Sequence, residues 1–173
     1  MDGLSFVIAD TEETLEAVER LAYEIWNEHF PSIIGQAQVD YMLEKFSSLA
    51  AMQNFQKEGY MFYIMKSESH HLGYFSYKLE KKMLILSKLY VHADHRGKGI
   101  ARETMKFMGA IAKKEGKLTV RLTVNRDNLG SIQAYEKMGF EKISEVVMDI
   151  GGGFVMDDFV MSVAIDKLIS FTK

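Results

Sequence analysis

The part of the chain best suited to chemistry is a run of glycine and basic residues, His95-Arg96-Gly97-Lys98-Gly99-Ile100-Ala101. It directly follows the apolar run Met83–Val91, and apolar residues recur after it at helical spacing. A glycine-rich turn that opens a helix leaves backbone N–H groups free to bind an anion, and the positive end of the helix dipole adds to that attraction. Gly97 and Gly99 let the backbone approach a phosphate without Cβ clashes, while the arginine and the lysine add positive charge. The run predicts a site for the phosphates of a cofactor.

Two better-known phosphate loops do not fit this run. The P-loop pattern G-x-x-x-x-G-K-[ST] is absent from the sequence. A dinucleotide pattern G-x-G-x-x-G that began at Gly97 would need glycine where the chain has Arg102. The pattern that fits is Arg-x-x-Gly-x-Ala, formed by Arg96, Gly99 and Ala101.

A second block, Asn125–Phe140, reads NRDNLGSIQAYEKMGF and follows the strand-like run Leu118–Val124. Together with the first block, LYVHADHRGKGIA, it resembles the GNAT superfamily of acyl-CoA-dependent N-acetyltransferases over residues 83–145. More narrowly, the chain resembles the bacterial polyamine acetyltransferases of the Pai type. That narrower resemblance is carried by Trp26, Asp40-Tyr41-Met42-Leu43 and the ending Asp149–Met161.

The resemblance implies a mixed α/β fold, with a mostly antiparallel sheet of six to seven strands flanked by helices. It implies one N-acetyltransferase domain over residues 1–173, splayed near strands 83–91 and 118–124, with acetyl-CoA as cofactor and no metal. The pantetheine arm would lie along Leu89, Tyr90 and Val91, and one of their N–H groups would polarise the thioester carbonyl. The implied phosphate contacts are Arg96, Gly97, Lys98, Gly99, Ile100 and Ala101.

The resemblance also assigns Tyr135 as the general acid that protonates the leaving thiolate. A phenol with a pKa of about 10 can donate to a thiolate whose conjugate acid has a pKa of about 8.5. The alternative is that Tyr135 only packs beside Ile132 and Phe140. Asn128 would bind the pantetheine or cap the following helix, and these two roles are compatible. Ser131 is a lesser candidate for cofactor binding.

The general base is not identified by the sequence. Many family members carry a glutamate on the strand before the phosphate loop, but the corresponding residues here are Ser87 and Lys88. A primary amine with a pKa of about 10.4 must still lose a proton before it can attack. A water relay to a backbone carbonyl, or to His92, Asp94 or Asp149, is an open alternative.

The acceptor site is suggested by alternation in the run 154–163. Asp157 shares one face with apolar residues, while Asp158 points to the other face. We expect Asp157 to help hold a positively charged amine between aromatic walls formed by Trp26 and Tyr41. The alternative is that Asp157 pairs locally and that Trp26 belongs to the core.

The elements that must position these residues follow from periodicity and from turn signals. Asp10 is expected to cap the first helix, with Glu13 as its capping-box partner. A helical region over Val39–Lys57 is expected to break near Ser47-Ser48. Strands are predicted at 4–9, 60–65, 72–78, 83–91, 118–124, 140–149 and 154–163, and further helices at 98–114 and 128–138.

Composition excludes several classes of protein. The chain has no cysteine, which excludes disulfides, thiolate metal sites and a cysteine nucleophile. A formal net charge of −3 gives no basic footprint for nucleic acid, and the five histidines show no third ligand for a metal. The N-terminus lacks the features of a signal peptide and no apolar run approaches a membrane span, so we expect a cytoplasmic protein without membrane contact.

The expected activity is transfer of an acetyl group from acetyl-CoA to a primary amine by direct attack in a ternary complex, since no G-x-S-x-G elbow or cysteine offers a nucleophile. A polyamine such as spermidine is the expected acceptor. The alternatives are a peptide N-terminus, a lysine or a small amino compound, a non-catalytic acyl-CoA-binding regulator, and a nucleotide-binding interaction module. A homodimer is compatible with the sequence.

Overall fold

The computed structural model describes residues 3–171 of the chain. These residues pack as two compact units. The first comprises the chain up to Lys78 together with Lys88–Ile100, and the second comprises Leu79–Ser87 together with the chain from Ala101 onward. The glycine-rich run therefore ends at the boundary, with Ile100 in the first unit and Ala101 in the second.

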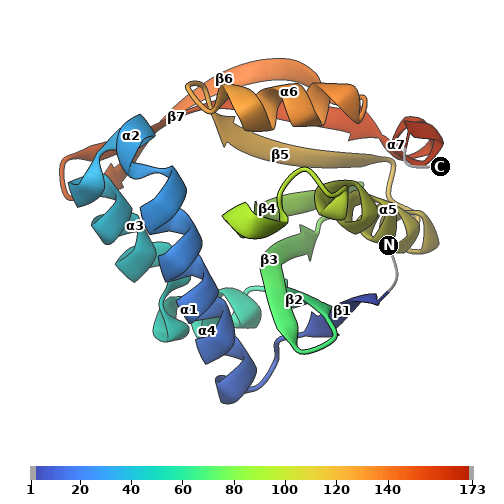
Figure 1. The fold of residues 1–173 in the computed structure, drawn as a ribbon. Coiled ribbons are helices and arrows are strands. Elements are labelled where there is room, and N and C mark those ends of the chain that lie inside the picture. Colours follow the sequence, from blue (N-terminus) through green and yellow to red (C-terminus); the bar gives the residue numbers. More distant parts are fainter. Residues whose placement is uncertain (1–2, 172–173) are drawn as a thin grey trace. The chain divides into compact units, whose positions relative to one another are not determined.

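The described residues form a seven-stranded sheet in the order β1-β2-β3-β4-β5-β7-β6 (Figure 1). The pairs β1–β2, β2–β3, β5–β7 and β6–β7 are antiparallel, whereas β4 and β5 run parallel. This confirms the predicted mixed α/β fold with a mostly antiparallel sheet. The strands are β1 (Leu4–Ile8), β2 (Tyr60–Ser67), β3 (His70–Leu79), β4 (Met83–Val91), β5 (Thr119–Asn125), β6 (Glu141–Gly151) and β7 (Phe154–Ala164).

Four helices precede β2 in the first unit: α1 (Glu12–His29), α2 (Pro31–Ile34), α3 (Gln36–Ser47) and α4 (Leu49–Lys57). In Figure 1 they form the blue and cyan group, in which α1 packs against the other three and α4 packs against β2. Leucine, valine and alanine on one face of α1 join Met52, Phe62 and Tyr74 in a continuous buried core. The predicted break of the second helical region is confirmed, since Ser48 accepts a hydrogen bond from Ala51 N and separates α3 from α4.

The predicted cap of α1 is wrong by one residue. Thr11, rather than Asp10, is the N-cap, and its hydroxyl accepts from the backbone N–H of Thr14 at 3.2 Å. The hydroxyl of Thr14 in turn accepts from Thr11 N at 3.1 Å, so Thr14 takes the part expected of Glu13. Two threonines three residues apart satisfy the same orphan N–H groups that an Asp–Glu pair would satisfy.

The second unit contains α5 (Ile100–Lys114) from Ala101 onward, and this helix connects β4 to the parallel strand β5. It also contains α6 (Leu129–Lys137), which leads to β6. The expected βαβ arrangement is therefore present. A short helix not predicted from the sequence, α7 (Ile165–Phe171), packs against β7, and its Leu168 is fully buried beside Gly109 of α5. Gly152 and Gly153 have positive φ and turn β6 into β7, as the glycine run predicted.

β3 and β4 approach each other unusually closely in the first unit. A Cβ on the buried Gly73 would lie 2.2 Å from the carbonyl oxygen of Tyr90 and 3.0 Å from Cα of Val91. The same backbone segment of β4 is the one expected to receive the pantetheine arm. Because Gly73 has no side chain, the backbone of β4 at Tyr90 and Val91 can lie directly against β3.

We expect Gly73→Ala to lower the free energy of unfolding by about 2–3 kcal/mol, because the added methyl group must displace the backbone of β4. Urea unfolding followed by circular dichroism measures the change. The matched control is Gly130→Ala in α6, where an added Cβ meets nothing within 4 Å and stability should be unchanged or slightly higher. Equal stability of Gly73→Ala and the wild type would contradict the close approach.

Candidate functional site

The glycine-rich run forms a loop with unused N–H donors. Gly97 and Gly99 have φ values of 73° and 78°, in the left-handed region that glycine adopts without strain. Within residues 3–171, the N–H groups of Gly97, Lys98 and Gly99 have no hydrogen-bond acceptor. The next residue, Ile100, begins α5. Free donors at a helix N-terminus form a suitable cradle for a phosphate group.

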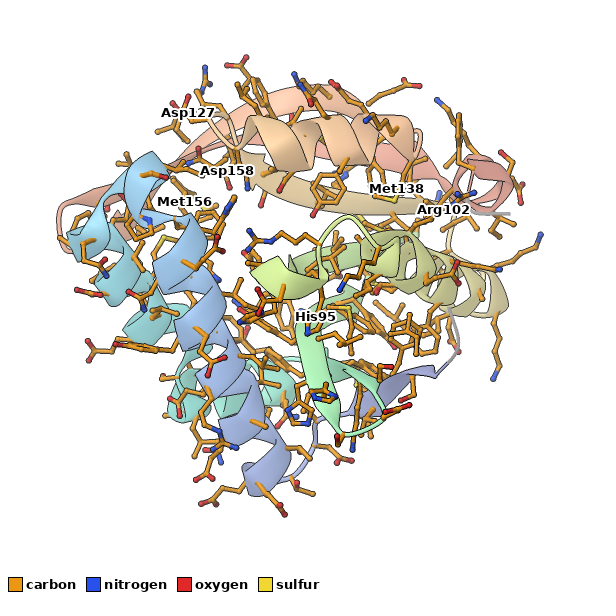
Figure 2. All side chains as sticks on the ribbon, in the orientation of Figure 1. His95, Arg102, Asp127, Met138, Met156 and Asp158 are labelled. Carbon is orange, nitrogen blue, oxygen red and sulfur yellow. The ribbon has the colours of Figure 1, made fainter. Side chains whose placement is uncertain are left out.

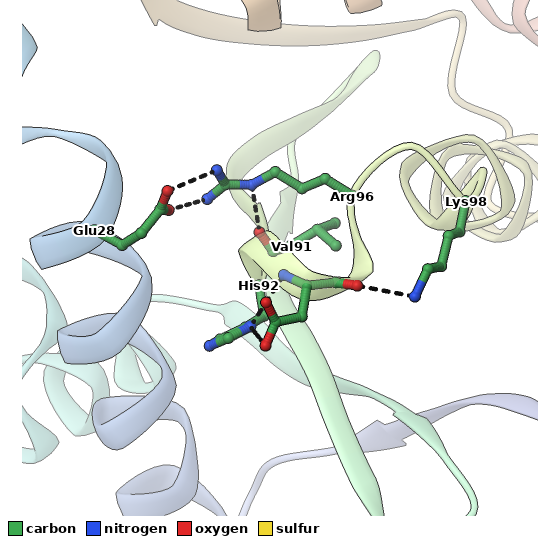
Figure 3. Close-up of polar contacts among 6 residues, drawn as sticks. Glu28, Val91, His92, Arg96 and Lys98 are labelled. Atoms are coloured by element: carbon green, nitrogen blue, oxygen red, sulfur yellow. Dashed lines mark hydrogen bonds and ion pairs between the residues drawn. The ribbon is translucent and has the colours of Figure 1, made fainter.

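The two basic side chains of the loop make contacts of their own (Figure 3). Arg96 donates to both carboxylate oxygens of Glu28, at 2.8 and 3.4 Å, and its Nε donates to the Val91 carbonyl at 3.0 Å. The ammonium of Lys98 donates to the Asp94 carbonyl at 2.8 Å. Arg96 thus joins the loop to α1 and to the end of β4. In this structure both side chains hold the shape of the loop while adding positive charge beside the free N–H groups.

The β4 segment Leu89–Val91 is half-buried beside an aromatic cluster of the first unit. The ring of Tyr90 lies 5.5 Å from Trp26 and 6.0 Å from Phe30, and Trp26 and Phe30 lie 4.4 Å apart. Trp26 has an exposed fraction of only 6%. Trp26 therefore belongs to the core that packs against β4, as the alternative interpretation held.

Tyr41, the second expected aromatic wall, lies on α3 and already contacts a cation of the chain. The ammonium of Lys45 donates to the Tyr41 hydroxyl at 3.0 Å and lies 5.3 Å from the centre of its ring. A bound amine would have to share this ring with Lys45. The aromatic-wall role of Tyr41 stays a prediction.

The junction between β5 and α6 carries the second block of the sequence. Asn128 is buried and caps α6, since its side-chain oxygen accepts from Ser131 N at 3.4 Å. Its own N–H donates to the Asn125 carbonyl at 3.0 Å, which closes the turn. The capping role is therefore present, while cofactor binding by Asn128 and Ser131 stays a prediction.

Tyr135 lies on the same helix and is half-buried. Its ring packs at 5.6 Å from Phe140, as the packing alternative expects. Burial raises the pKa of the Tyr135 phenol to about 12. The hydroxyl is therefore protonated throughout the physiological range, which is the state that a general acid requires.

Asp157 and Asp158 are neighbours on β7 with opposite surroundings. The carboxylate of Asp157 accepts from Arg126 Nε at 2.7 Å, and Arg126 also donates to Glu145 at 3.0 Å. Asp157 thus pairs locally, as the alternative interpretation held, and its side chain is 41% exposed. A substrate amine would have to compete with Arg126 for this carboxylate, which weakens the case for Asp157 as its anchor.

Asp158 is the residue that sequence reasoning did not select. It is only 4% exposed, and its register partner on β5 is Asn125. Burial raises its pKa from 3.8 to about 6, with a smaller increase from nearby Asp157, while a hydrogen bond from the Thr123 hydroxyl lowers it. Alternation had placed Asp158 on the face opposite Asp157, but only the sheet register shows that this face is buried at that point.

The two positions where the family resemblance led us to expect a glutamate, Ser87 and Lys88, offer no carboxylate. Ser87 is exposed, whereas Lys88 is buried, with its ammonium 5.7 Å from the ring centre of Phe55. Burial lowers the pKa of Lys88 to about 8. Two of the suggested relay groups serve local turns, because His92 accepts from Asp94 N and Asp149 accepts from Gly151 N.

Among residues 3–171, no group of three or more His, Cys, Asp or Glu side chains is placed to hold a metal ion. No helix in this part of the chain combines the length and the hydropathy that a membrane span needs.

Comparison with known proteins adds an independent line of evidence. A model of the acetyltransferase (GNAT) family matches residues 19–140. N-acetyltransferase 8 of Rattus norvegicus is 36% identical over 70 residues, which are 40% of this chain and 32% of that protein. The uncharacterized N-acetyltransferase YobR of Bacillus subtilis is 37% identical over 60 residues, covering 35% of this chain and 24% of YobR. The matches span a third or less of the length of these relatives.

Solved structures share the fold over nearly the whole chain. The PaiA N-acetyltransferase of Thermoplasma acidophilum, in complex with coenzyme A, superimposes with a TM-score of 0.72 and 22% identity, covering 93% of this chain and 98% of that one. The spermidine N-acetyltransferase of Vibrio cholerae, in complex with CoA and spermine, gives 0.71 and 15% identity, covering 98% and 99%. At these identities the likeness establishes the fold.

Replacing Arg96 should weaken CoA binding. We expect Arg96→Ala to raise the Kd for CoA about tenfold, equivalent to about 1.4 kcal/mol, because the loop loses its bonds to α1 and β4. Glu28→Gln keeps the Nε bond to Val91 and should give a smaller increase. Isothermal titration calorimetry measures both, and an unchanged affinity of Arg96→Ala would contradict the role assigned to its contacts.

The buried Asp158 should make stability depend on pH. Its pKa is raised by folding, so the native state binds the proton more tightly than the unfolded state does. The free energy of unfolding of the wild type, relative to Asp158→Asn, should therefore fall by roughly 2 kcal/mol as the pH rises from 4 to 7. Urea unfolding of both proteins across this range measures the difference, and a constant difference would show that folding leaves this pKa unchanged.

Proposed function

Because the chain belongs to the acetyltransferase (GNAT) family, we propose that it transfers an acetyl group from acetyl-CoA to a primary amine. The observation that carries this proposal is the loop after β4, where the N–H groups of Gly97, Lys98 and Gly99 have no acceptor among the described residues. The loop has the family's Arg-x-x-Gly-x-Ala pattern and opens α5 as a phosphate cradle should.

The cofactor contacts in this proposal are those expected from the sequence. The pyrophosphate is held by the residues from Arg96 to Ala101, and the pantetheine arm follows Leu89–Val91, where a backbone N–H polarises the thioester carbonyl. Asn128 and Ser131 contact the arm. Residues 1–173 then act as one N-acetyltransferase domain, although the described residues 3–171 pack as two units.

The reaction in this proposal is a direct attack of the amine on the thioester. The amine nitrogen bonds to the carbonyl carbon, the carbon–sulfur bond breaks, and the Tyr135 hydroxyl gives its proton to the leaving thiolate. The position of Tyr135 on α6, within the second block of the sequence, supports this role, and its phenol is protonated at neutral pH; the pKa raised by burial makes it a weaker donor than an ordinary phenol.

A polyamine such as spermidine is the acceptor that we propose. The support is the sequence resemblance at Trp26, Asp40–Leu43 and Asp149–Met161. A peptide N-terminus, a lysine or a small amino compound is the alternative acceptor. The cytoplasmic location and the homodimer stay predictions.

The test is release of CoA from acetyl-CoA in the presence of spermidine, spermine, putrescine, free amino acids and short peptides. We expect saturable release with polyamines, and Tyr135→Phe should lower kcat about 10²-fold or more while the Kd for CoA is unchanged. An undiminished kcat in Tyr135→Phe would leave the tyrosine a packing role only.

The other outcomes separate the alternatives. Release with peptides alone would move the acceptor class to proteins. Tight CoA binding without release for any amine would identify a non-catalytic acyl-CoA-binding regulator. Thermal protection by ATP equal to that by CoA would indicate a nucleotide-binding module.

A further inference from the structure

Asp158 is a carboxyl group that folding buries without an opposite charge. Its exposed fraction is 4%, and no Lys, Arg or His of residues 3–171 lies within ion-pair distance of it. Burial of an unpaired carboxylate costs several kcal/mol, so proteins rarely keep one for stability alone. A titratable group in such a setting is a candidate for function.

The neighbouring Asp157 shows that the local sequence does not require this arrangement. Asp157 points to the other face of β7, where Arg126 and Glu145 form an ion-pair network with it. Two adjacent carboxylates of one strand thus differ in burial and in pairing: the exposed one is paired with a cation, and the buried one is not. The unpaired member is able to accept a proton or a positively charged ligand.

The position of Asp158 within the second unit is close to the cofactor-binding block. It lies opposite Asn125, the last residue of β5, and the N–H of Arg126 donates to the Asp157 carbonyl at 3.0 Å. Only two residues then separate Arg126 from α6, the helix that carries the proposed general acid. Figure 2 labels Asp158 near Asp127, at the end of β5 that leads to α6.

Thr123 on β5 is an exposed neighbour of Asp158. The parallel pairing of β4 with β5 ends at Leu86 and Leu122. Among the described residues, Thr123–Asn125 of β5 therefore pair with β7 alone. Thr123 is exposed although β5 is an interior strand of the sheet, and its hydroxyl donates to Asp158. A substrate that reaches Thr123 is therefore next to the buried carboxylate.

We propose that Asp158 is the general base of the acetyl transfer and receives the proton of the acceptor amine. The inference rests on the proposed function. A carboxylate oxygen of Asp158 takes a proton from the bound ammonium, which frees the lone pair of the nitrogen to bond to the thioester carbon, and the nitrogen then releases its second surplus proton to water. The carbon–sulfur bond breaks, the thiolate takes the proton of Tyr135, and exchange with water restores both side chains.

This assignment supplies the base that is missing from β4. Neither Ser87 nor the buried, positively charged Lys88 can replace the glutamate of other family members, whereas Asp158 provides a carboxylate from β7 instead. Its pKa of about 6 leaves it ionised at neutral pH, yet makes it a stronger base than an ordinary aspartate.

The experiment compares steady-state kinetics of the wild type, Asp158→Asn and Glu145→Gln, with spermidine and with 2,2,2-trifluoroethylamine as acceptors. We expect Asp158→Asn to lower kcat with spermidine about 10²-fold or more and to leave the KM for acetyl-CoA unchanged. The loss should be smaller with the fluorinated amine, which is unprotonated at neutral pH. Glu145→Gln removes an exposed carboxylate of β6 and should retain the wild-type kcat.

Further variants keep the test decisive. Asp158→Glu retains a proton acceptor and should recover part of the activity lost in Asp158→Asn. Wild-type kcat in Asp158→Asn would overturn the proposal. If the wild type itself acetylates no amine, the proposed function fails, and the role of Asp158 fails with it.

Discussion

The geometry of the glycine-rich loop, His95–Ala101, depends on the side chain of Arg96. Its guanidinium binds a carboxylate of α1 and the carbonyl that ends β4, and so fixes the point where the strand turns into the loop. A planar fork with several donors can hold two acceptors at once, which a lysine cannot do with the same geometry. The glycines that follow are then free to leave their N–H groups unpaired, because the loop does not need those bonds to keep its shape.

In the first unit, the side chains that pack against β4 determine the position of its backbone. Tyr90 is held between Trp26, Phe30 and Tyr74, and Gly73 allows β3 to lie against its backbone. Side chains of the core therefore determine where the backbone donors of β4 lie. In this arrangement Trp26 acts on the backbone of β4 indirectly, by packing against the ring of Tyr90.

The features that were predictable from sequence are those encoded locally. The strand–glycine–helix pattern of the loop, the break at Ser48 and the glycine turn before β7 each depend on residues within one turn of each other. The cap at Thr11 was missed because Asp10 and Glu13 satisfy the same pattern one residue earlier. The burial of Asp158 could not be predicted from the sequence for another reason. It depends on the register of β7 with β5 and β6, which alternation within one strand does not specify.

The buried carboxylate on β7 also bears on how the protein would respond to selection for heat resistance. Removing an uncompensated charge from an interior raises thermal stability, so a laboratory screen that scores only the folded fraction would enrich replacements at Asp158. Given the base role proposed for Asp158, selection for turnover would act in the opposite direction at the same codon. An engineering campaign on this chain therefore needs both readouts from its first round.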